Sequence, residues 1–356
     1  MAKQVTIKEI AQMAGVSPGT VDRILHNRGN VSASSTEAVE RVLAATGYKY
    51  NIHTSAISLK KTYRIIIAIP TAVKGEYWGI VQLGIERAIE EYSDINIQCE
   101  YAFYNQFDIY SCRSSFRSIL DRNPNAVIIG ATFASETAIL CEKLDNAGIP
   151  YAFVDSVVEG TKPVVTYSSD QNACGRIVGR LLELFSPGYD AEFAVFGSRR
   201  TGNERATNSM SRISGLLEYF NERKSGRTIK ESKISVLDPE ESEKDILRFL
   251  NDNPKVKCIA ILNSRGYIIA DILASHSIED INIVSFDLTT NNSRCLEEGS
   301  IAAVICQRPE LQGFHAVKSL IHALLYNVRD KDIHHFMPAD IIIRENLMFY
   351  QEIFIN

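Results

Sequence analysis

The sequence predicts a small all-helical head followed by an α/β body made of two doubly wound parallel sheets. Two short helices joined by a tight turn are expected within residues 5–29. From Arg64 onward, apolar runs of strand length alternate with amphipathic helical stretches, which is typical of parallel sheets covered on both faces. The chain has 356 residues, 45% of them hydrophobic, so two or three domains are expected and the body is too long for one such sheet.

The first helix is predicted to begin near Ile7. Thr6 and Glu9 form a capping box, in which each side chain satisfies a backbone N–H that the first turn leaves unpaired. Apolar residues at helical spacing form one buried face, and Gly15 then supplies the backbone freedom that a helix end needs. The residues of this face are Ile7, Ile10, Ala11 and Ala14.

A second helix follows the turn at Gly15. Ser17 is its predicted N-cap, and Pro18 occupies the first helical position, where a missing N–H costs nothing. Its apolar face comprises Val21, Ile24 and Leu25, which leaves Asp22, Arg23 and His26 on another face. Two such helices match a helix-turn-helix unit, whose second helix lies in the DNA major groove. Spacing alone leaves an ordinary helical hairpin open as the alternative.

A third helix completes the predicted head. Ser32, which follows Val31, is its N-cap, and Gly47-Tyr48 ends it. The next segment, Asn51–Leu59, is too short to be a stable helix alone, so DNA or a partner would have to order it.

Charge is distributed unevenly along the chain. Residues 1–62 carry eight Lys or Arg and four Asp or Glu, a net charge of +4, whereas the remainder carries −9. A basic head on an acidic body indicates a polyanionic partner for the head alone.

The seven cysteines are scattered and include no C-x-x-C pair, so reduced thiols without a metal site are expected. No cofactor motif is present either. The N-terminus has no signal-peptide core and no run is long and apolar enough to span a membrane, so a cytoplasmic protein is expected.

The body is predicted to alternate strands with helices. The predicted strands are Ile65–Ile69, Ile95–Tyr101, Ala126–Ile129, Tyr151–Val154, Glu192–Phe196, Cys258–Leu262, Ile283–Phe286 and Ala302–Cys306. Predicted helices include Tyr77–Tyr92, Ser135–Ala147, Asn172–Phe185 and Asn208–Lys224. Ligands of such folds bind outside the carboxyl ends of the strands.

The head segment Val5–Asn27, the helix start at Val31-Ser32, Gly47-Tyr48 and Asn51 together resemble the LacI/GalR family of bacterial transcription regulators. The body is similar to the ribose-type periplasmic sugar-binding proteins. The resemblance implies a helix-turn-helix domain over residues 1–50, a hinge over 51–62 and a periplasmic-binding-protein-like domain over 63–356. The first lobe is expected at 63–167 and 288–326, and the second at 168–287 and 327–356.

The resemblance makes Ser17–His26 the recognition helix, with Ser17 and Thr20 near phosphates and Arg23 at a base edge. Pro18 and Gly19 stand where the family often has longer base-contacting side chains. Asp22 replaces the family's usual Ser, and it either contacts a base or is a solvated acid. The implied DNA contacts are Thr6, Ser17, Pro18, Gly19, Thr20, Asp22, Arg23, His26, Asn27, Val31, Ser32, Asn51, Thr54 and Ile57.

Asn51–Leu59 resembles the family's hinge helix, which orders on DNA and inserts an apolar wedge into the minor groove. Ile57 stands in the position of the usual Leu, and Thr54 replaces the usual Ala. Because Ile is β-branched, the hinge is expected to order less readily.

Residues that align with sugar contacts of the ribose-type pattern are Tyr77, Trp78, Asp155, Arg212, Asn263, Asp287 and Gln307. Planar groups that bind paired hydroxyls, together with an aromatic platform, are what polyol recognition requires. Each residue alone also has a structural explanation as a cap or a core side chain. Ser156 and Ala131-Thr132 depart from the family pattern and change the expected hydroxyl preference.

Two further clusters are left open. For Arg199, Arg200 and Arg205 a solvated loop is the simpler interpretation, and contact with an anionic ligand group is the alternative. For His334-His335 a loop pair is the simplest interpretation, because no third metal ligand is near in sequence.

These features predict a dimeric transcription regulator, a repressor by family majority, that binds a pseudopalindromic operator in double-stranded DNA and a small carbohydrate between its lobes. A solute-binding protein is the alternative, and the basic head weighs against it. An enzyme is not expected, because no nucleophile elbow, phosphate-binding loop or metal cluster is present.

Overall fold

The computed structural model describes residues 7–25, 31–46, 62–202, 206–326 and 333–350. The chain divides into two compact units, residues 1–61 and 62–356, and each is described by itself. Thr6, His26, Asn27 and the predicted hinge with Asn51, Thr54 and Ile57 lie outside the described residues.

The first unit contains the three predicted helices, α1 (Ile7–Ala14), α2 (Pro18–Leu25) and α3 (Ala33–Thr46). Their core consists of Ile10, Ala11, Val21 and Val39. The caps predicted at Ser17 and Ser32 are present, since the Thr20 N–H donates to Ser17 Oγ over 3.1 Å and the Ser35 N–H donates to Ser32 Oγ over 3.3 Å. Gly15 has a φ of +66°, a left-handed conformation that suits glycine at the end of α1.

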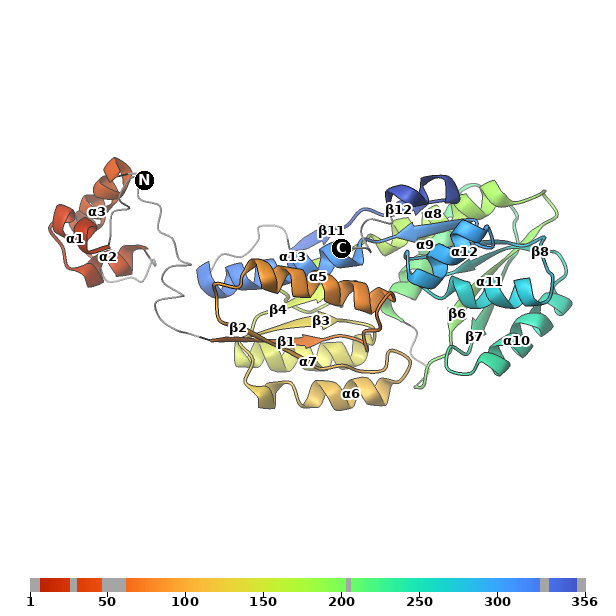
Figure 1. Ribbon diagram of the computed structural model, residues 1–356, viewed down its shortest axis with the longest axis horizontal. Coiled ribbons are helices and arrows are strands. Elements are labelled where there is room, and N and C mark those ends of the chain that lie inside the picture. Colours follow the sequence, from red (N-terminus) through yellow and green to blue (C-terminus); the bar gives the residue numbers. More distant parts are fainter. Residues whose placement is uncertain (1–6, 26–30, 47–61, 203–205, 327–332, 351–356) are drawn as a thin grey trace. The chain divides into compact units, whose positions relative to one another are not determined.

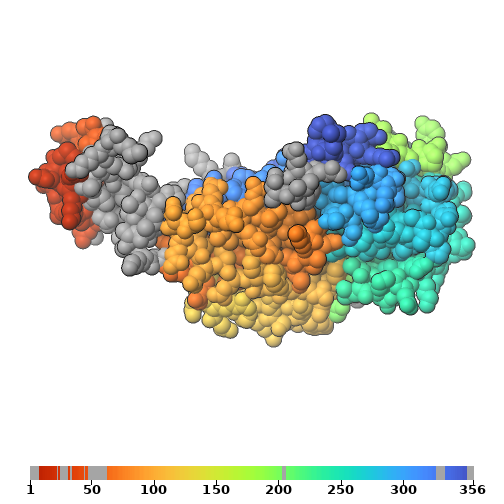
Figure 2. All heavy atoms as spheres, viewed as in Figure 1, coloured from red at the N-terminus to blue at the C-terminus, as the bar shows by residue number. Residues whose placement is uncertain are grey.

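The second unit contains two six-stranded sheets, each covered by helices on both faces (Figure 1). Figure 2 shows two adjoining masses in this unit. Residues coloured orange and yellow form one of them, and residues coloured green and blue form the other. The predicted fold class is therefore confirmed. Among the described residues, no helix is long and apolar enough to cross a membrane.

The first lobe has a parallel sheet in the order β11-β5-β4-β3-β1-β2. Helices α5 and α13 pack on one face and α6 and α7 on the other. The strands are β1 (Tyr63–Ala68), β2 (Ile97–Tyr101), β3 (Ala126–Gly130), β4 (Tyr151–Val154), β5 (Val165–Ser168) and β11 (His334–Phe336). The helices are α5 (Tyr77–Glu91), α6 (Ile109–Arg117), η1 (Leu120–Arg122), α7 (Ala134–Ala147) and α13 (Pro309–Tyr326).

The second lobe has the order β12-β10-β9-β8-β6-β7, in which only the β10–β12 pair is antiparallel. Helices α8 and α9 cover one face, and α10, α11 and α12 cover the other. The strands are β6 (Glu192–Ser198), β7 (Ile229–Ile234), β8 (Val256–Ile261), β9 (Asn282–Phe286), β10 (Ala303–Cys306) and β12 (Asp340–Ile342). The helices are α8 (Gln171–Phe185), α9 (Thr207–Glu222), α10 (Pro239–Asp252), α11 (Gly266–Ser275), α12 (Thr290–Glu298) and η2 (Arg344–Phe349).

The sheet topology corrects the expected lobe boundaries in two places. Residues 288–306 were expected in the first lobe, yet α12 packs on the second sheet and β10 pairs with β9. Strand β11 was expected in the second lobe, but it pairs with β5 in the first. The chain therefore crosses between lobes after β5, after β10 and after β11. The second crossing comes later than expected because the apolar row Ala303–Cys306 pairs with β9 of the second sheet before the chain returns to the first lobe at α13.

Candidate functional site

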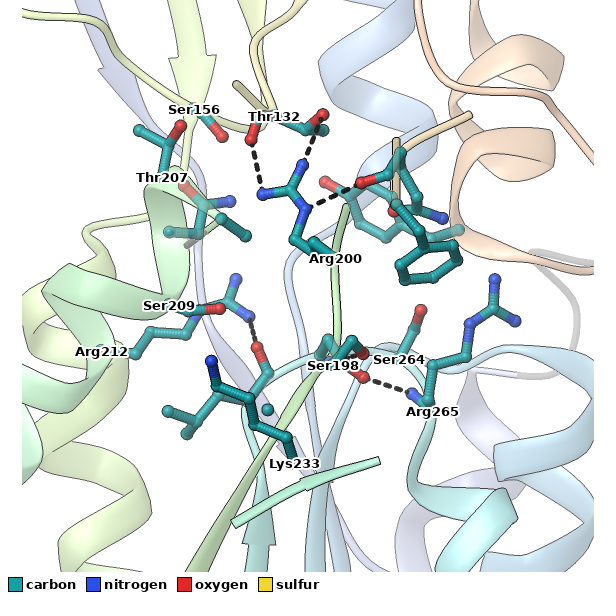
Figure 3. A pocket seen from close by; sticks show the side chains of 18 of the residues that line it. Thr132, Ser156, Ser198, Arg200, Thr207, Ser209, Arg212, Lys233, Ser264 and Arg265 are labelled. Carbon is teal, nitrogen blue, oxygen red and sulfur yellow. Dashed lines mark hydrogen bonds between the residues drawn. The ribbon is translucent and has the colours of Figure 1, made fainter. Parts of the chain in front are cut away.

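A cavity of about 380 Å³ lies between the two lobes, where the strands of both sheets end (Figure 3). The seven residues expected to contact a sugar all line it. They are Tyr77, Trp78, Asp155, Arg212, Asn263, Asp287 and Gln307. They come from both lobes and from widely separated parts of the sequence, so their convergence depends on the fold.

Two buried aspartates occupy equivalent places in the lobes. Asp155 follows β4 and Asp287 follows β9, with φ angles of 73° and 61°. Each backbone N–H donates to a neighbouring strand, at Tyr167 O (3.0 Å) and Ile305 O (2.9 Å). Asp tolerates the left-handed conformation better than most residues, which is one reason why it suits these strand ends.

Both carboxylates accept hydrogen bonds from cavity side chains. The Tyr77 hydroxyl donates to Asp155 Oδ1 over 2.8 Å, and Gln307 Nε2 donates to Asp287 Oδ1 over 3.0 Å. Burial raises the pKa of Asp155, and it raises the pKa of Asp287 to about 7, while nearby Arg212 opposes both changes. The cavity therefore holds one carboxyl group that titrates near neutral pH.

Arg212, on α9, is a buried cation of the cavity, with 3% of its surface exposed. Its Nε donates to Gln171 Oε1 (2.7 Å), Nη1 to Leu262 O (2.7 Å) and Nη2 to Gln307 Oε1 (2.8 Å). The guanidinium also lies 3.9 Å from the centre of the Phe286 ring. These contacts hold the planar fork in one orientation, so it can present its remaining donors to a ligand.

The aromatic pair at the start of α5 forms one wall. The Tyr77 and Trp78 rings meet edge to face with centroids 5.1 Å apart. Trp78 also packs tightly against the end of β3, because a Cβ added at Gly130 would lie 2.6 Å from its ring. Trp78 is therefore both a core side chain and a cavity wall.

Asn263 follows β8 and is fixed by its neighbours. Its Nδ2 donates to Ser198 Oγ over 3.0 Å, and its Oδ1 accepts from the Arg265 N–H over 2.9 Å. Its side chain is thus oriented by contacts at both ends.

Side chains also join the two lobes across the cavity. Arg265 of the second lobe forms an ion pair with Glu76 of the first, and both side chains are only 16% exposed. Thr207 Oγ1 donates to Ala131 O over 3.0 Å. A change in the separation of the lobes would break these contacts.

Arg200 differs from the solvated loop residue that was the simpler expectation. Its Nε donates to Gln106 O and its Nη1 to Thr132 O, each over 2.9 Å, and its guanidinium lies 3.7 Å from the centre of the Phe133 ring. Arg200 therefore connects the second lobe to the first at the cavity wall. By contrast, Arg199 pairs with acidic residues of α10, and Arg205 lies outside the described residues.

Several cavity residues were not expected from the sequence, namely Thr132, Ser156, Ser198, Thr207, Ser209, Lys233, Ser264 and Arg265, whereas for Arg200 a ligand contact had been left open as the alternative (Figure 3). Most lie on loops or on β7, which was not predicted as a strand. Thr132 and Ser156 had been noted only as departures from the family pattern.

The described residues contain no group of three or more His, Cys, Asp or Glu that could hold a metal ion. His334 and His335 belong to β11 rather than to the expected loop. The seven cysteines are free thiols, and six of them are buried.

In the helical unit, the described side chains expected to face DNA are partly or fully exposed. Ser17, Pro18, Gly19, Arg23 and Ser32 are exposed, whereas Thr20 and Val31 are half-buried. Asp22 lies within α2, but its side chain is outside the described set.

Two sequence families match the chain. Residues 6–51 match "Bacterial regulatory proteins, lacI family", and residues 65–326 match "Periplasmic binding protein domain". Together these matches span the helical unit and most of the body.

Relatives cover most of the chain. It is 22% identical over 290 residues to the HTH-type transcriptional regulator DegA of Bacillus subtilis, with 80% of this chain and 82% of that protein covered. It is 23% identical over 291 residues to the ribose operon repressor of Lactococcus lactis, with 79% and 80% covered.

Solved structures show the same fold. A putative LacI transcriptional regulator from Bacteroides fragilis is 29% identical, with a TM-score of 0.77 and coverage of 82% of this chain and 100% of that one. GanP, a glucose-galactose binding protein from Geobacillus stearothermophilus, is 20% identical, with a TM-score of 0.70 and coverage of 81% and 99%.

Proposed function

The chain belongs to the LacI family of DNA-binding transcription regulators and carries a periplasmic-binding-protein domain, and from this we propose that it is a repressor controlled by a carbohydrate bound between its lobes. One observation carries the proposal. The seven residues expected to contact a sugar line a single cavity between two doubly wound lobes. The name of the ribose operon repressor supports the same class of ligand.

The cavity chemistry suits a polyol. Asp155 and Asp287 can accept hydrogen bonds from hydroxyl groups, while Arg212 can donate to hydroxyl oxygens. Tyr77 and Trp78 supply an apolar wall for the C–H surface of a sugar ring. Because these groups come from both lobes, a bound sugar would favour one relative arrangement of the lobes over another.

This preference for one arrangement of the lobes would switch the affinity of the protein for its operator. A ligand shifts an equilibrium only by its difference in affinity for the two states, and couplings of about 1–3 kcal/mol are typical. We assign release of the operator to the liganded state. The helical unit would act as a homodimer on a pseudopalindrome in the cytoplasm, with one α2 helix in each half-site.

The DNA-binding face can be tested with two substitutions. Arg23→Ala should relax sequence preference at one operator position, because Arg23 is exposed on α2 and guanine is the commonest base partner of Arg. Lys60→Ala should weaken all DNA sequences alike and flatten the salt dependence. Equal effects of both variants on sequence preference would contradict this assignment.

The ligand proposal is tested by a thermal-shift screen of sugars and polyols, because a binder adds RT ln(1 + [L]/Kd) to stability. A stabilising carbohydrate should lose its effect in Asp155→Asn and keep it in Asp280→Asn, since Asp280 is exposed and lies outside the cavity lining. No stabilisation by any carbohydrate, or turnover of one, would contradict the proposal.

A further inference from the structure

Lys233 is a cation of the cavity that the proposed sugar contacts do not use. It lies on β7, the edge strand of the second sheet, where it is exposed to solvent and lines the cavity. Figure 3 shows its side chain pointing up into the cavity on the side that also holds Ser209 and Arg212. A lysine directed into a ligand cavity is a ready partner for an anion.

The charge of Lys233 is not neutralised by the described part of the chain. No ion pair or hydrogen bond joins its ammonium group to any described residue, although Glu231 lies two positions earlier on the same strand. Lys230, three residues before it, pairs instead with Glu192 at 3.9 Å. The two lysines of β7 therefore differ in partner and in location, since only Lys233 lines the cavity.

The buried carboxylates of the cavity are engaged by other groups. Asp155 accepts from Tyr77 and from Ser156 Oγ (3.2 Å), and Asp287 accepts from Gln307. If hydroxyl groups of a ligand bind these carboxylates, Lys233 remains available to bind a different substituent of the same ligand.

A helix start in the cavity lining also favours negative charge, while Glu231 adds one carboxylate to the same lining. The first turn of α9 lines the cavity, and its N-cap, Ala206, offers no side-chain acceptor to the N–H groups at the helix start. Ser209, in the same turn, adds a hydroxyl donor to the cavity lining. The main evidence for an anionic ligand group is that Lys233 lines the cavity without an ion pair to any described residue, and the helix start is secondary evidence.

We propose that the effector is a carbohydrate with one anionic substituent, a carboxylate or a phosphate, which binds Lys233 and Ser209 while the hydroxyls bind Asp155, Asp287 and Arg212. This assignment rests on the proposed carbohydrate-sensing function and narrows its ligand class. It makes Lys233 the residue that distinguishes acidic sugars from their neutral parents.

The test compares matched ligands on the full-length protein. Calorimetric and thermal-shift titrations use glucose, glucuronate and glucose 6-phosphate, and the corresponding galactose series. At least one acidic sugar should bind tenfold or more tightly than its neutral parent, as expected for a charge-assisted hydrogen bond. A preference for the uronate or for the phosphate identifies which anion is recognised.

Three variants of β7 separate ligand specificity from folding. Lys233→Gln should remove the preference for the acidic sugar, Lys233→Arg should retain most of it, and Lys230→Gln should leave it unchanged. Unliganded melting temperatures of the two Gln variants should agree within a few degrees. If Lys233→Gln and Lys230→Gln alter the preference alike, the inference is wrong.

The two proposals fail in different ways. If neutral sugars bind as tightly as acidic ones and Asp155→Asn abolishes that binding, the sugar sensor stands and the anionic subsite does not exist. If neither charge class stabilises the protein, both the subsite and the carbohydrate-sensing function are refuted.

Discussion

Replacing Asp287 with Asn should stabilise the protein while impairing its cavity. Asp287 is fully enclosed, and burial raises its pKa from 3.8 to about 7. Asn keeps an acceptor for Gln307, and it tolerates the φ of 61° about as well as Asp. The substitution therefore removes a buried charge with little disturbance of the backbone.

The magnitude follows from proton linkage. The folded protein holds a proton on Asp287 up to about pH 7, whereas the unfolded chain releases it near pH 3.8. Wild-type stability therefore falls by about 1.4 kcal/mol per pH unit across this interval and levels off above it. Asn does not titrate, so the advantage of Asp287→Asn should grow with pH and reach on the order of 4 kcal/mol at pH 8.

The assay is urea unfolding of both proteins at pH 5, 6, 7 and 8. Asp280→Asn is the control, because the hydrogen bond from Lys257 lowers the pKa of that exposed carboxyl group. This control should show no gain in stability that grows between pH 5 and 8. A difference between wild type and Asp287→Asn that is equal at pH 5 and pH 8, or a variant less stable at pH 8, would refute the reasoning.

Three other outcomes are expected. Glu76→Gln and Arg265→Gln, which break the ion pair between the lobes, should each weaken carbohydrate binding several-fold, and calorimetry of the double variant should show little further loss. Gly84→Ala should destabilise the protein by about 1–3 kcal/mol, because its Cβ would meet the backbone of α13, while Gly188→Ala, in open space, should not, as urea unfolding will show. Sedimentation should show a dimer, and a monomer at micromolar concentration would contradict the two-half-site proposal.

The elements with clear apolar periodicity could be predicted from the sequence. Ala126–Gly130 and Tyr151–Val154 are continuous apolar strands, and the caps at Ser17 and Ser32 mark helix starts through local hydrogen bonds. Strand β7, with the sequence IKESKI, was missed because an edge strand needs little apolar surface. Strand β11 pairs with β5 from a distant part of the chain, so no local signal marks its lobe.

The residues of the candidate site also fall into those that the sequence could predict and those that it could not. Asp155 and Asp287 could be identified because each directly follows an apolar strand, and parallel strands end at one edge of a sheet. The contacts of Arg200 depend on carbonyl groups of the opposite lobe, which no local pattern reveals. Lys233 was missed with its strand, so the cation proposed to set ligand charge is visible only in the folded chain.

The most direct test of the whole account is a selection of genomic DNA fragments by the full-length protein at low ionic strength, with and without each carbohydrate of the panel. The account predicts that pseudopalindromic fragments are retained selectively and that at least one carbohydrate releases them. If no fragment is retained selectively, or if no carbohydrate that binds the protein changes retention, a sensor that controls a DNA-binding head is contradicted.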